Sequence, residues 1–468
     1  MRTRLALVAG AGICALTVGA AAFAGGDHGK EREHSDKAHS NQDFGIVQPI
    51  DSSSQNSIDA ATANSDPRKL ATFAKQLKAK VVATVDGAPN IDMMALWPND
   101  QNPQWLIACN EEGPAQVGLL RVRLSDGLSE AIVSGGLSSC DPVHATPWGT
   151  IVFGEEAGSS GRMFELISPL NTTGVTVNPD GSTSGGTGAA NIVWRSAMGK
   201  LSFEGVGIYP NGVAYYGDEN RPGTGTPGGA YFKFVPTVLR NPAAGPVASL
   251  AESPLAAGSV YGLRLGLRSG ATDYGQGTET GRGTWVLAAN TPGVNLRAAA
   301  ATLKLTGYYR PEDLAIDQVA LAAGNVRWCG NNTGNEIDDR SYGNTICLTD
   351  GTLAAAGALA STPEVQLLAV GNPEMAMMDN IAYQPGRANW IIHEDGDQLL
   401  GNNDLWDCMD DGMDDDLLGD ACIRIGTLND LNAEWTGGLF SADGKRFFVS
   451  VQHNVTGKGV ILEVTGWK

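Results

Sequence analysis

The chain has 468 residues, of which 61 are glycine and only 18% are charged, and its 32 basic and 51 acidic residues give a formal net charge of −19. This length suits one large domain or two to three ordinary ones, and the glycine-rich composition favours a turn-rich β protein over a helical one. The acidic balance argues against a nucleic-acid partner, which needs a basic footprint, and suits a secreted protein, a holder of metal cations or simply a soluble one.

The first 24 residues have the pattern of a secretory signal peptide. Arg2 and Arg4 precede an apolar run from Leu5 to Ala22, and Ala22-Phe23-Ala24 matches a small-x-small cleavage site. No later stretch approaches the ~20 apolar residues of a membrane span. The sequence therefore predicts export to the periplasm or the extracellular space, no membrane span, and a protein that we expect to be a monomer.

A polar tract follows from residue 25 to about residue 68, with too little apolar content to fold alone. We expect it to be disordered and to act as a linker, although its three histidines leave a metal-scavenging tail as an alternative. Residues 69–468 then form the folded domain.

Six cysteines remain after removal of the signal peptide, and an even number in an exported chain suggests disulfides. Short polar loops favour the pairs Cys329–Cys347 and Cys408–Cys422, and Cys109–Cys140 follows by elimination. Six cysteines allow 15 pairings, so other pairings stay open. No CxxC motif occurs, so a thiolate zinc site is not expected.

An internal repeat pairs a strand that begins with an acidic residue with a second strand that ends in polar residues. The first strands read "DMMALWP" from Asp92, "DPVHATP" from Asp141, "EGVGIYP" from Glu204, "EDLAIDQ" from Glu312, "DNIAYQP" from Asp379 and "TGGLFSADG" from Thr436, where threonine replaces the acid. Strand pairs recurring at about this spacing are typical of a β-propeller. We therefore predict an all-β fold, a six-bladed propeller with insertions; a seventh blade in the 108-residue step from Glu204 to Glu312 is the alternative.

Because the first strand of each propeller blade lines the central channel, the five leading carboxylates should meet near the axis. Converging carboxylates repel, and bound cations are the simplest compensation. An almost all-oxygen donor set favours calcium over zinc. Each carboxylate taken alone is better explained as a turn-former or a solvated strand end, but five in register reverse that judgement and favour a site. The predicted metal ligands are Asp92, Asp141, Glu155, Glu156, Glu204, Glu219, Glu312 and Asp379.

The stretch "YYRPEDLAID" adds an arginine to this set of acids. Arg310 and Glu312 are two residues apart and would share one face of a strand, so both should reach the mouth of the channel. A guanidinium beside metal-bound carboxylates is suited to binding a phosphoryl group bidentately. We predict Arg310 and Glu312 as catalytic residues, with a structural ion pair to Glu312 or Asp313 as the alternative role of Arg310.

Five stretches together resemble the PhoX-type bacterial alkaline phosphatases, namely "TPWGTIVFGEE", "LSFEGVGIYPNGVAYYGDEN", "YYRPEDLAID", "MDNIAYQPG" and "GGLFSADGKRFFVSVQHN". The resemblance implies a six-bladed propeller whose axial site holds calcium and iron and cleaves phosphate monoesters. It also implies a phosphate-binding role for Arg310 and metal-binding roles for Glu204, Glu312 and Asp379.

Phe203 and Met378 stand where the family has a histidine and a proline, but the departure that matters is Gly154, which stands where the family has a cysteine that ligates iron. Calcium is therefore the expected cofactor, and iron stays a less favoured one. We predict an exported, metal-dependent hydrolase of small phosphate esters. The alternative is a calcium-stabilised propeller without catalytic activity that serves as a binding or structural protein.

Overall fold

The computed structural model describes residues 44–221, 228–266, 280–334, 342–396, 401, 403–410 and 421–468. The predicted signal peptide and the first part of the polar tract lie outside these residues. Within them, none of the helices has the length and apolar character that crossing a membrane requires.

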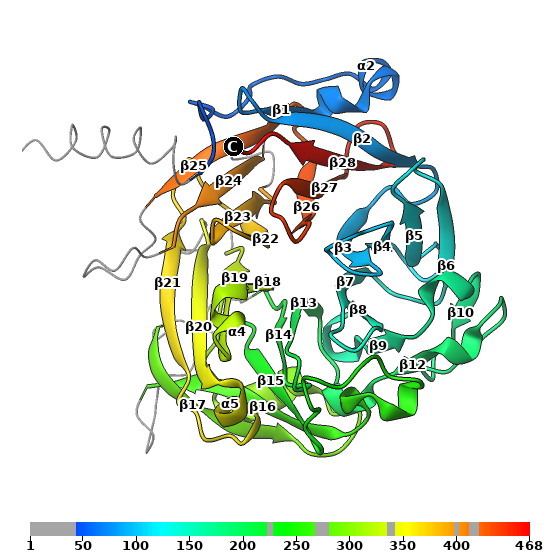
Figure 1. Ribbon diagram of the computed structural model, residues 1–468, viewed down its shortest axis with the longest axis vertical. Helices are drawn as coiled ribbons and strands as arrows, with labels where there is room; N and C mark the ends of the chain where they lie inside the picture. The colour runs from blue at the N-terminus through cyan, green and yellow to red at the C-terminus, as the bar shows by residue number, and fades with distance from the viewer. Residues whose placement is uncertain are drawn as a thin grey trace, which may run out of the picture.

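The strands form five hydrogen-bonded sheets that stand around a central axis in a propeller-like arrangement (Figure 1). Six strands face the centre of this ring, and each packs against the next one around it until the last closes onto the first. The inner strands are β3 (Ile91–Trp97), β7 (Cys140–Ala145), β13 (Phe203–Ile208), β18 (Pro311–Ile316), β22 (Met378–Gln384) and β26 (Glu434–Phe440). They carry the predicted repeat.

Four of the sheets begin at one inner strand and run outward. The β3 sheet continues with β4 (Trp105–Asn110), β5 (Leu119–Arg123), β6 (Ser129–Gly135), β10 (Val175–Val177) and β11 (Thr183–Ser184). The β7 sheet continues with β8 (Ile151–Glu155), β9 (Met163–Leu166) and β12 (Ile192–Trp194). The β22 sheet continues with β23 (Asn389–Glu394), β24 (Asp404–Cys408), β25 (Cys422–Leu428) and β1 (Ala71–Phe73). The β26 sheet continues with β27 (Arg446–Gln452), β28 (Gly459–Thr465) and β2 (Lys78–Val85), so that the start and the end of the folded domain share one sheet.

The fifth sheet has nine strands and contains two of the inner strands. From β13 it runs through β14 (Ala214–Asp218), β15 (Tyr231–Pro236), β16 (Gly258–Leu265), β17 (Gly281–Ala289), β21 (Glu364–Val370), β20 (Asn344–Thr352) and β19 (Asn325–Asn332) to β18. Strands β15 to β17 lie in the long step of the repeat and extend the β13 sheet. No inner strand for a seventh blade occurs among the described residues of this step.

Within the described residues helices are few and short, and they lie in the connections between strands. The α-helices are α2 (Ala60–Ser65), α3 (Leu296–Leu303), α4 (Gln318–Ala322) and α5 (Leu353–Gly357). The 3-10 turns are η1 (Pro67–Leu70), η2 (Gly158–Ser160), η3 (Pro169–Asn171), η4 (Ala189–Asn191), η5 (Ser196–Met198), η6 (Leu250–Glu252) and η7 (Pro254–Ala256).

Residues 44–68 correct the prediction that the whole polar tract is disordered. Phe44 and Ile46 are buried in the core that lies between the β22 and β26 sheets. The amide of Ile50 donates to the Arg424 carbonyl at 2.9 Å, and that of Ile58 donates to the Asn429 carbonyl at 2.7 Å. The segment is therefore held by the outer edge of a sheet, which supplies the hydrogen bonds and the apolar surface that the segment lacks by itself.

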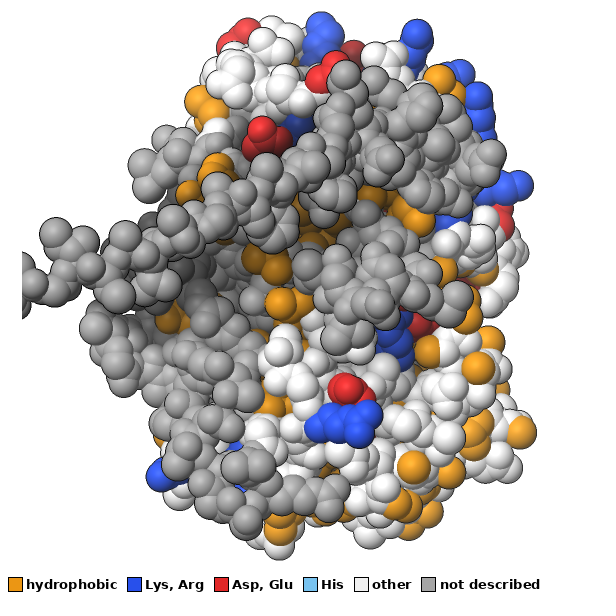
Figure 2. Space-filling model, turned by 90° about the vertical axis from the view of Figure 1, so that its left-hand side faces the viewer, with side chains coloured by type: hydrophobic (Ala, Val, Ile, Leu, Met, Phe, Trp, Pro, Cys, Tyr) orange, Lys and Arg blue, Asp and Glu red, His pale blue; other side chains and the backbone are white. Residues whose placement is uncertain are grey.

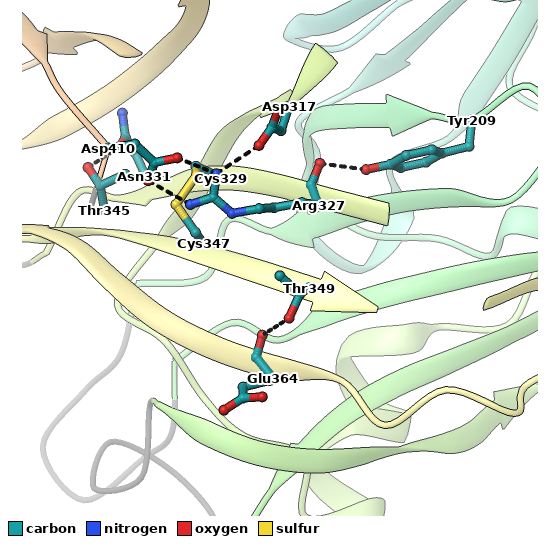
Figure 3. Close-up of a disulfide and its surroundings, with 10 residues drawn as sticks. All are labelled: Tyr209, Asp317, Arg327, Cys329, Asn331, Thr345, Cys347, Thr349, Glu364 and Asp410. Carbon is teal, nitrogen blue, oxygen red and sulfur yellow. Dashed lines mark hydrogen bonds and ion pairs between the residues drawn. A yellow bond between two sulfur atoms is a disulfide. The ribbon is translucent and has the colours of Figure 1, made fainter. Parts of the chain in front are cut away.

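All three predicted disulfides are confirmed. Cys329–Cys347 and Cys408–Cys422 each join directly paired residues of neighbouring strands, whereas Cys109–Cys140 joins β4 to the inner strand of the next sheet. Figure 3 shows the Cys329–Cys347 bridge beside Arg327, whose guanidinium pairs with Asp317 and Asp410. Figure 2 shows one side of the ring, where exposed acidic and basic side chains lie next to each other among uncharged ones.

Candidate functional site

A shift of register at the same place in every inner strand turns the leading carboxylates toward the axis. Pairing with the second strand is interrupted after Ile91, Cys140, Phe203, Pro311 and Met378, and it resumes three residues later in each case. Such a bulge leaves residues out of the ladder and redirects their side chains. The first residue of each bulge is one of the five repeat acids, namely Asp92, Asp141, Glu204, Glu312 and Asp379.

The sixth inner strand shows where the predicted alignment was wrong. Its register shift lies between Thr436 and Leu439, so Gly437, and not Thr436, stands where the other strands have their acid. Gly437 has a φ of +63°, and a Cβ there would lie 2.3 Å from the Asp92 carbonyl oxygen. A carboxylate side chain does not fit at this position. The same strand instead contributes its first residue, Glu434, to the cavity described next.

A cavity of about 410 Å³ lies at this convergence. Ten of its sixteen lining residues are acidic, and a single arginine and a single histidine are the basic ones. The lining residues are Asp92, Glu111, Asp141, Glu156, Glu204, Glu219, Arg310, Glu312, Asp379, Asp395, Gly396, Asn403, Leu431, Asn432, Glu434 and His453. Seven of the eight predicted metal ligands and both predicted catalytic residues are therefore brought together.

Glu155 is the predicted ligand that does not line the cavity, so its prediction as a metal ligand is corrected. Its carboxylate is buried and forms an ion pair with Arg162 at 2.7 Å. Consecutive residues of an extended chain point to opposite faces. Of the adjacent pair Glu155 and Glu156, only Glu156 therefore reaches the cavity. Glu434 and His453 are lining residues that the ligand prediction missed.

Arg310 is the cation of the site and lies among carboxylates from three parts of the ring. Its Nε is 2.7 Å from Glu219 Oε1, and its Nη2 is 3.3 Å from Glu312 Oε1 and 3.9 Å from Asp395 Oδ2. Arg310 precedes β18 and has a φ of +56°, so a left-handed backbone, and not the predicted strand alternation, directs it beside Glu312. Thr333 Oγ1 donates to Glu312 Oε1 at 2.5 Å and fixes that carboxylate.

The acids of the cavity are strongly perturbed because they are buried together. Burial, followed by the charge of Glu219, raises the pKa of Glu156 to about 10. Burial also raises the pKa of Glu312 to about 8, although Arg310 pulls it down. Burial, followed by the charge of Asp92, raises the pKa of Asp141 well above its usual range, and burial, followed by the charge of Asp141, does the same to the pKa of Glu204. Without compensating positive charge, these groups would hold protons at neutral pH.

Three of these carboxylates form a group that could hold a metal ion. Oxygen atoms of Asp141, Glu156 and Glu204 all lie within 4.8 Å of one another. Among the described residues, Asp92 Oδ1 and Asp141 Oδ1 are buried and have no hydrogen-bond partner. Buried carboxylate oxygens without donors fit a hard cation that prefers oxygen ligands. The donor set therefore fits a metal.

Comparison with known proteins gives a likeness in fold. No protein-family model and no curated protein matches the chain. The solved structure of Pseudomonas fluorescens PhoX in complex with vanadate, a transition state analogue, matches with a TM-score of 0.61 and 16% identity over 90% of this chain and 97% of that chain. The PQQ-bound aldose sugar dehydrogenase of Streptomyces coelicolor matches with a TM-score of 0.42 and 13% identity, covering 84% of this chain and all of that one. The likeness to the first structure confirms the propeller arrangement.

Proposed function

We propose that the protein is an exported, metal-dependent hydrolase of small phosphate esters. The observation that carries the proposal is the convergence of ten carboxylates and one guanidinium on a single cavity at the centre of the ring. A site with this composition matches what a phosphoryl group and its cations require together. The three disulfides agree with export by the predicted signal peptide.

The proposal includes a six-bladed architecture, in which the nine-stranded sheet counts as two blades. Two features support this count. Six inner strands form the ring, and within the described residues the strand ladder of the large sheet passes from one half to the other at two residue pairs of β17 and β21, Gly281–Val365 and Arg282–Glu364. With this count each blade supplies one inner strand to the cavity.

Calcium is the cation that the proposed site takes. Asp141, Glu156 and Glu204 would hold one ion, and Asp92, Glu219, Glu312 and Asp379 offer further oxygen ligands. Iron is less favoured because no thiolate reaches the cavity. Cys140 is consumed by its disulfide, and a Cβ on Gly154 would lie 2.8 Å from Pro142 Cγ. When bound, cations of this kind polarise phosphoryl oxygens and supply an oxygen nucleophile.

Arg310 would bind the phosphoryl group. Its guanidinium offers five donors in a planar fork, and its present partners engage only part of them. A phosphate oxygen pair can therefore share the fork with Glu219 and Glu312. The fold likeness to PhoX, solved in complex with the transition state analogue vanadate, supports this proposal.

A second candidate, a calcium-stabilised propeller that binds without catalysis, is favoured by one observation. Arg310 already has three carboxylate neighbours within 3.9 Å, so its charge could serve only to neutralise them. In that case the cavity would hold cations and stabilise the ring, and Arg310 would have no contact with a substrate.

Hydrolysis of p-nitrophenyl phosphate by the full chain with calcium separates the two candidates. Arg310→Ala should lower the rate by about 10²–10³-fold, as loss of one preorganised charged contact does. Arg282→Ala is the matched control, because Arg282 is an exposed arginine that pairs with Glu364 on the outer strands. An active protein that is indifferent to Arg310→Ala would exclude the role given to Arg310. A protein that binds calcium and hydrolyses no phosphate ester would leave the binding protein as the function.

A further inference from the structure

A histidine at the mouth of the cavity is held in a strained backbone position. His453 follows β27 directly and has a φ of +53°, and its side chain is 47% exposed. Side chains other than glycine adopt this conformation at a cost, and they keep it where the surrounding structure enforces it. Among the eight described non-glycine residues with positive φ, Arg310 and His453 are the two that line the cavity.

The loop behind His453 enforces this position through buried hydrogen bonds. Asn454 is buried, and its Nδ2 donates to the Val451 carbonyl at 2.6 Å and to the Lys458 carbonyl at 2.8 Å. The amide of Val455 donates to Asp430 Oδ2 at 2.6 Å, which ties the loop to the segment before β26. The imidazole is therefore presented to the cavity by a fixed loop.

One carboxylate orients the imidazole ring. Glu434 Oε1 lies 3.1 Å from His453 Nε2. Burial raises the pKa of Glu434 well above its usual range, but when bound cations keep this carboxylate ionised it can only accept, and Nε2 then carries the proton. Nδ1 has no hydrogen-bond partner within the described part of the chain and stays available. The charged groups that act on this corner include Glu111, directly after β4, Asp395, after β23, and the repeat acids Asp92 and Asp379, and all of them line the same cavity.

We infer that His453 is the general acid that protonates the leaving oxygen of the phosphate ester, and that Glu434 is its positioning residue. The inference rests on the proposed function and extends it to substrate choice. In the step, the attacking oxygen forms a bond to phosphorus while the bond between phosphorus and the ester oxygen breaks. The electron pair of that bond goes to the ester oxygen, which takes the Nδ1 proton and leaves as an alcohol. The attacking water supplies a proton that recharges the imidazole.

The composition of the cavity leaves this task to His453. The other ionisable side chains that line the cavity are carboxylates, which accept protons when cations keep them ionised, and Arg310, whose guanidinium holds its proton too strongly. Imidazole is the side chain that exchanges a proton near neutral pH. A positioned general acid matters most for esters of alcohols, because an alkoxide is a poor leaving group and a nitrophenolate departs without protonation. The site should therefore hydrolyse alkyl phosphates, such as sugar and glycerol phosphates, and not only aryl phosphates.

The test compares an alkyl and an aryl substrate in His453→Asn. Asparagine is chosen because it tolerates the left-handed backbone. Hydrolysis of glycerol 2-phosphate should fall by about 10²–10⁴-fold, the usual contribution of a general acid. Hydrolysis of p-nitrophenyl phosphate should change far less, and inhibition by inorganic phosphate should stay the same because phosphate has no leaving group. Glu434→Gln should show the same pattern with a smaller loss.

Lys458→Gln is the matched control, since it removes a cation from the same loop that pairs with Asp86 outside the cavity. Lys458→Gln should change neither the rates of hydrolysis of the two substrates nor the inhibition by inorganic phosphate. An equal loss on both substrates in His453→Asn, or a weaker binding of inorganic phosphate, would overturn the inference and leave His453 a binding or structural residue. A wild-type protein that hydrolyses neither substrate would overturn the proposed function itself, and this inference with it.

Discussion

Removal of cations should destabilise the protein, and the loss should grow as the pH rises. Removal of the cations acts on the buried acids of the cavity. Glu156 and Glu312 have pKa values of about 10 and about 8, both above their ordinary value of 4.5, because burial disfavours their charged forms. A bound cation allows these groups to ionise, whereas the metal-free chain must keep them protonated or bear their repulsion.

The direction of this pH dependence follows from the numbers of protons that the folded and the unfolded chain bind. Between pH 4.5 and the raised values, the folded metal-free chain holds protons that the unfolded chain has released, so its free energy of unfolding falls as pH rises. One retained proton changes that free energy by 1.36 kcal/mol per pH unit, so the two groups together account for up to about 5 kcal/mol between pH 6 and pH 8. With about 2.1 cal/mol/K of unfolding entropy per residue, this corresponds to roughly 5 °C in melting temperature.

The measurement is thermal unfolding at pH 6, 7 and 8 with excess calcium and with a calcium chelator. Calcium at about 100 times its dissociation constant should stabilise each site by about 2.7 kcal/mol, or roughly 3 °C, and should flatten the pH dependence. Glu156→Gln should raise the melting temperature of the chelated protein at pH 8. The control Glu130→Gln alters a half-exposed carboxylate outside the cavity, which pairs with the buried Arg121, and it should leave the slope of melting temperature against pH unchanged. A chelated protein whose melting temperature is constant or rises with pH would refute the reasoning.

Two further substitutions test the packing beside the site and a buried ion pair inside the nine-stranded sheet. Gly154→Cys should destabilise the protein by about 1–3 kcal/mol and bind no iron, because its Cβ would lie 2.8 Å from Pro142 Cγ; an unchanged melting temperature with bound iron would contradict this. Asp350→Asn should cost about 3–5 kcal/mol in urea unfolding, because it leaves the fully buried Lys233, now 2.6 Å away, without its counter-charge. Glu364→Gln, which removes an exposed ion pair, should cost less than about 1 kcal/mol, and equal costs for the two variants would disprove the argument.

The repeat made the ring and most of the site predictable from sequence. A leading acid, an apolar strand and a polar second strand recur in order, and the five acids therefore fall at one level of the ring. The sixth inner strand, β26, could not be predicted in this way. Its bulge consists of Gly437 and Gly438, so the pattern shows no acid, and Glu434 enters the cavity from a position that the repeat does not use.

Other parts of the site and fold depend on contacts that a local pattern does not contain. Glu155 and Glu156 are chemically alike neighbours, and only the direction of the chain after β8 decides which one reaches the cavity. The burial of Phe44 likewise depends on an apolar surface built by strands more than three hundred residues later in the chain. A short segment with few apolar residues gives no periodicity from which such docking could be read.

The same bulges that aim the acids also lock neighbouring blades together, which explains how repelling carboxylates can be held at the axis. The second residue of the β18 bulge, Asp313, accepts a hydrogen bond from the Ile381 amide of β22 at 3.2 Å. The second residue of the β22 bulge, Asn380, accepts one from the Gly437 amide of β26 at 2.9 Å. Each of these bulges thus sends one side chain into the cavity and the next into the adjacent blade. The acids cannot move apart without breaking contacts between the blades, so the ring holds the site in position for its cations.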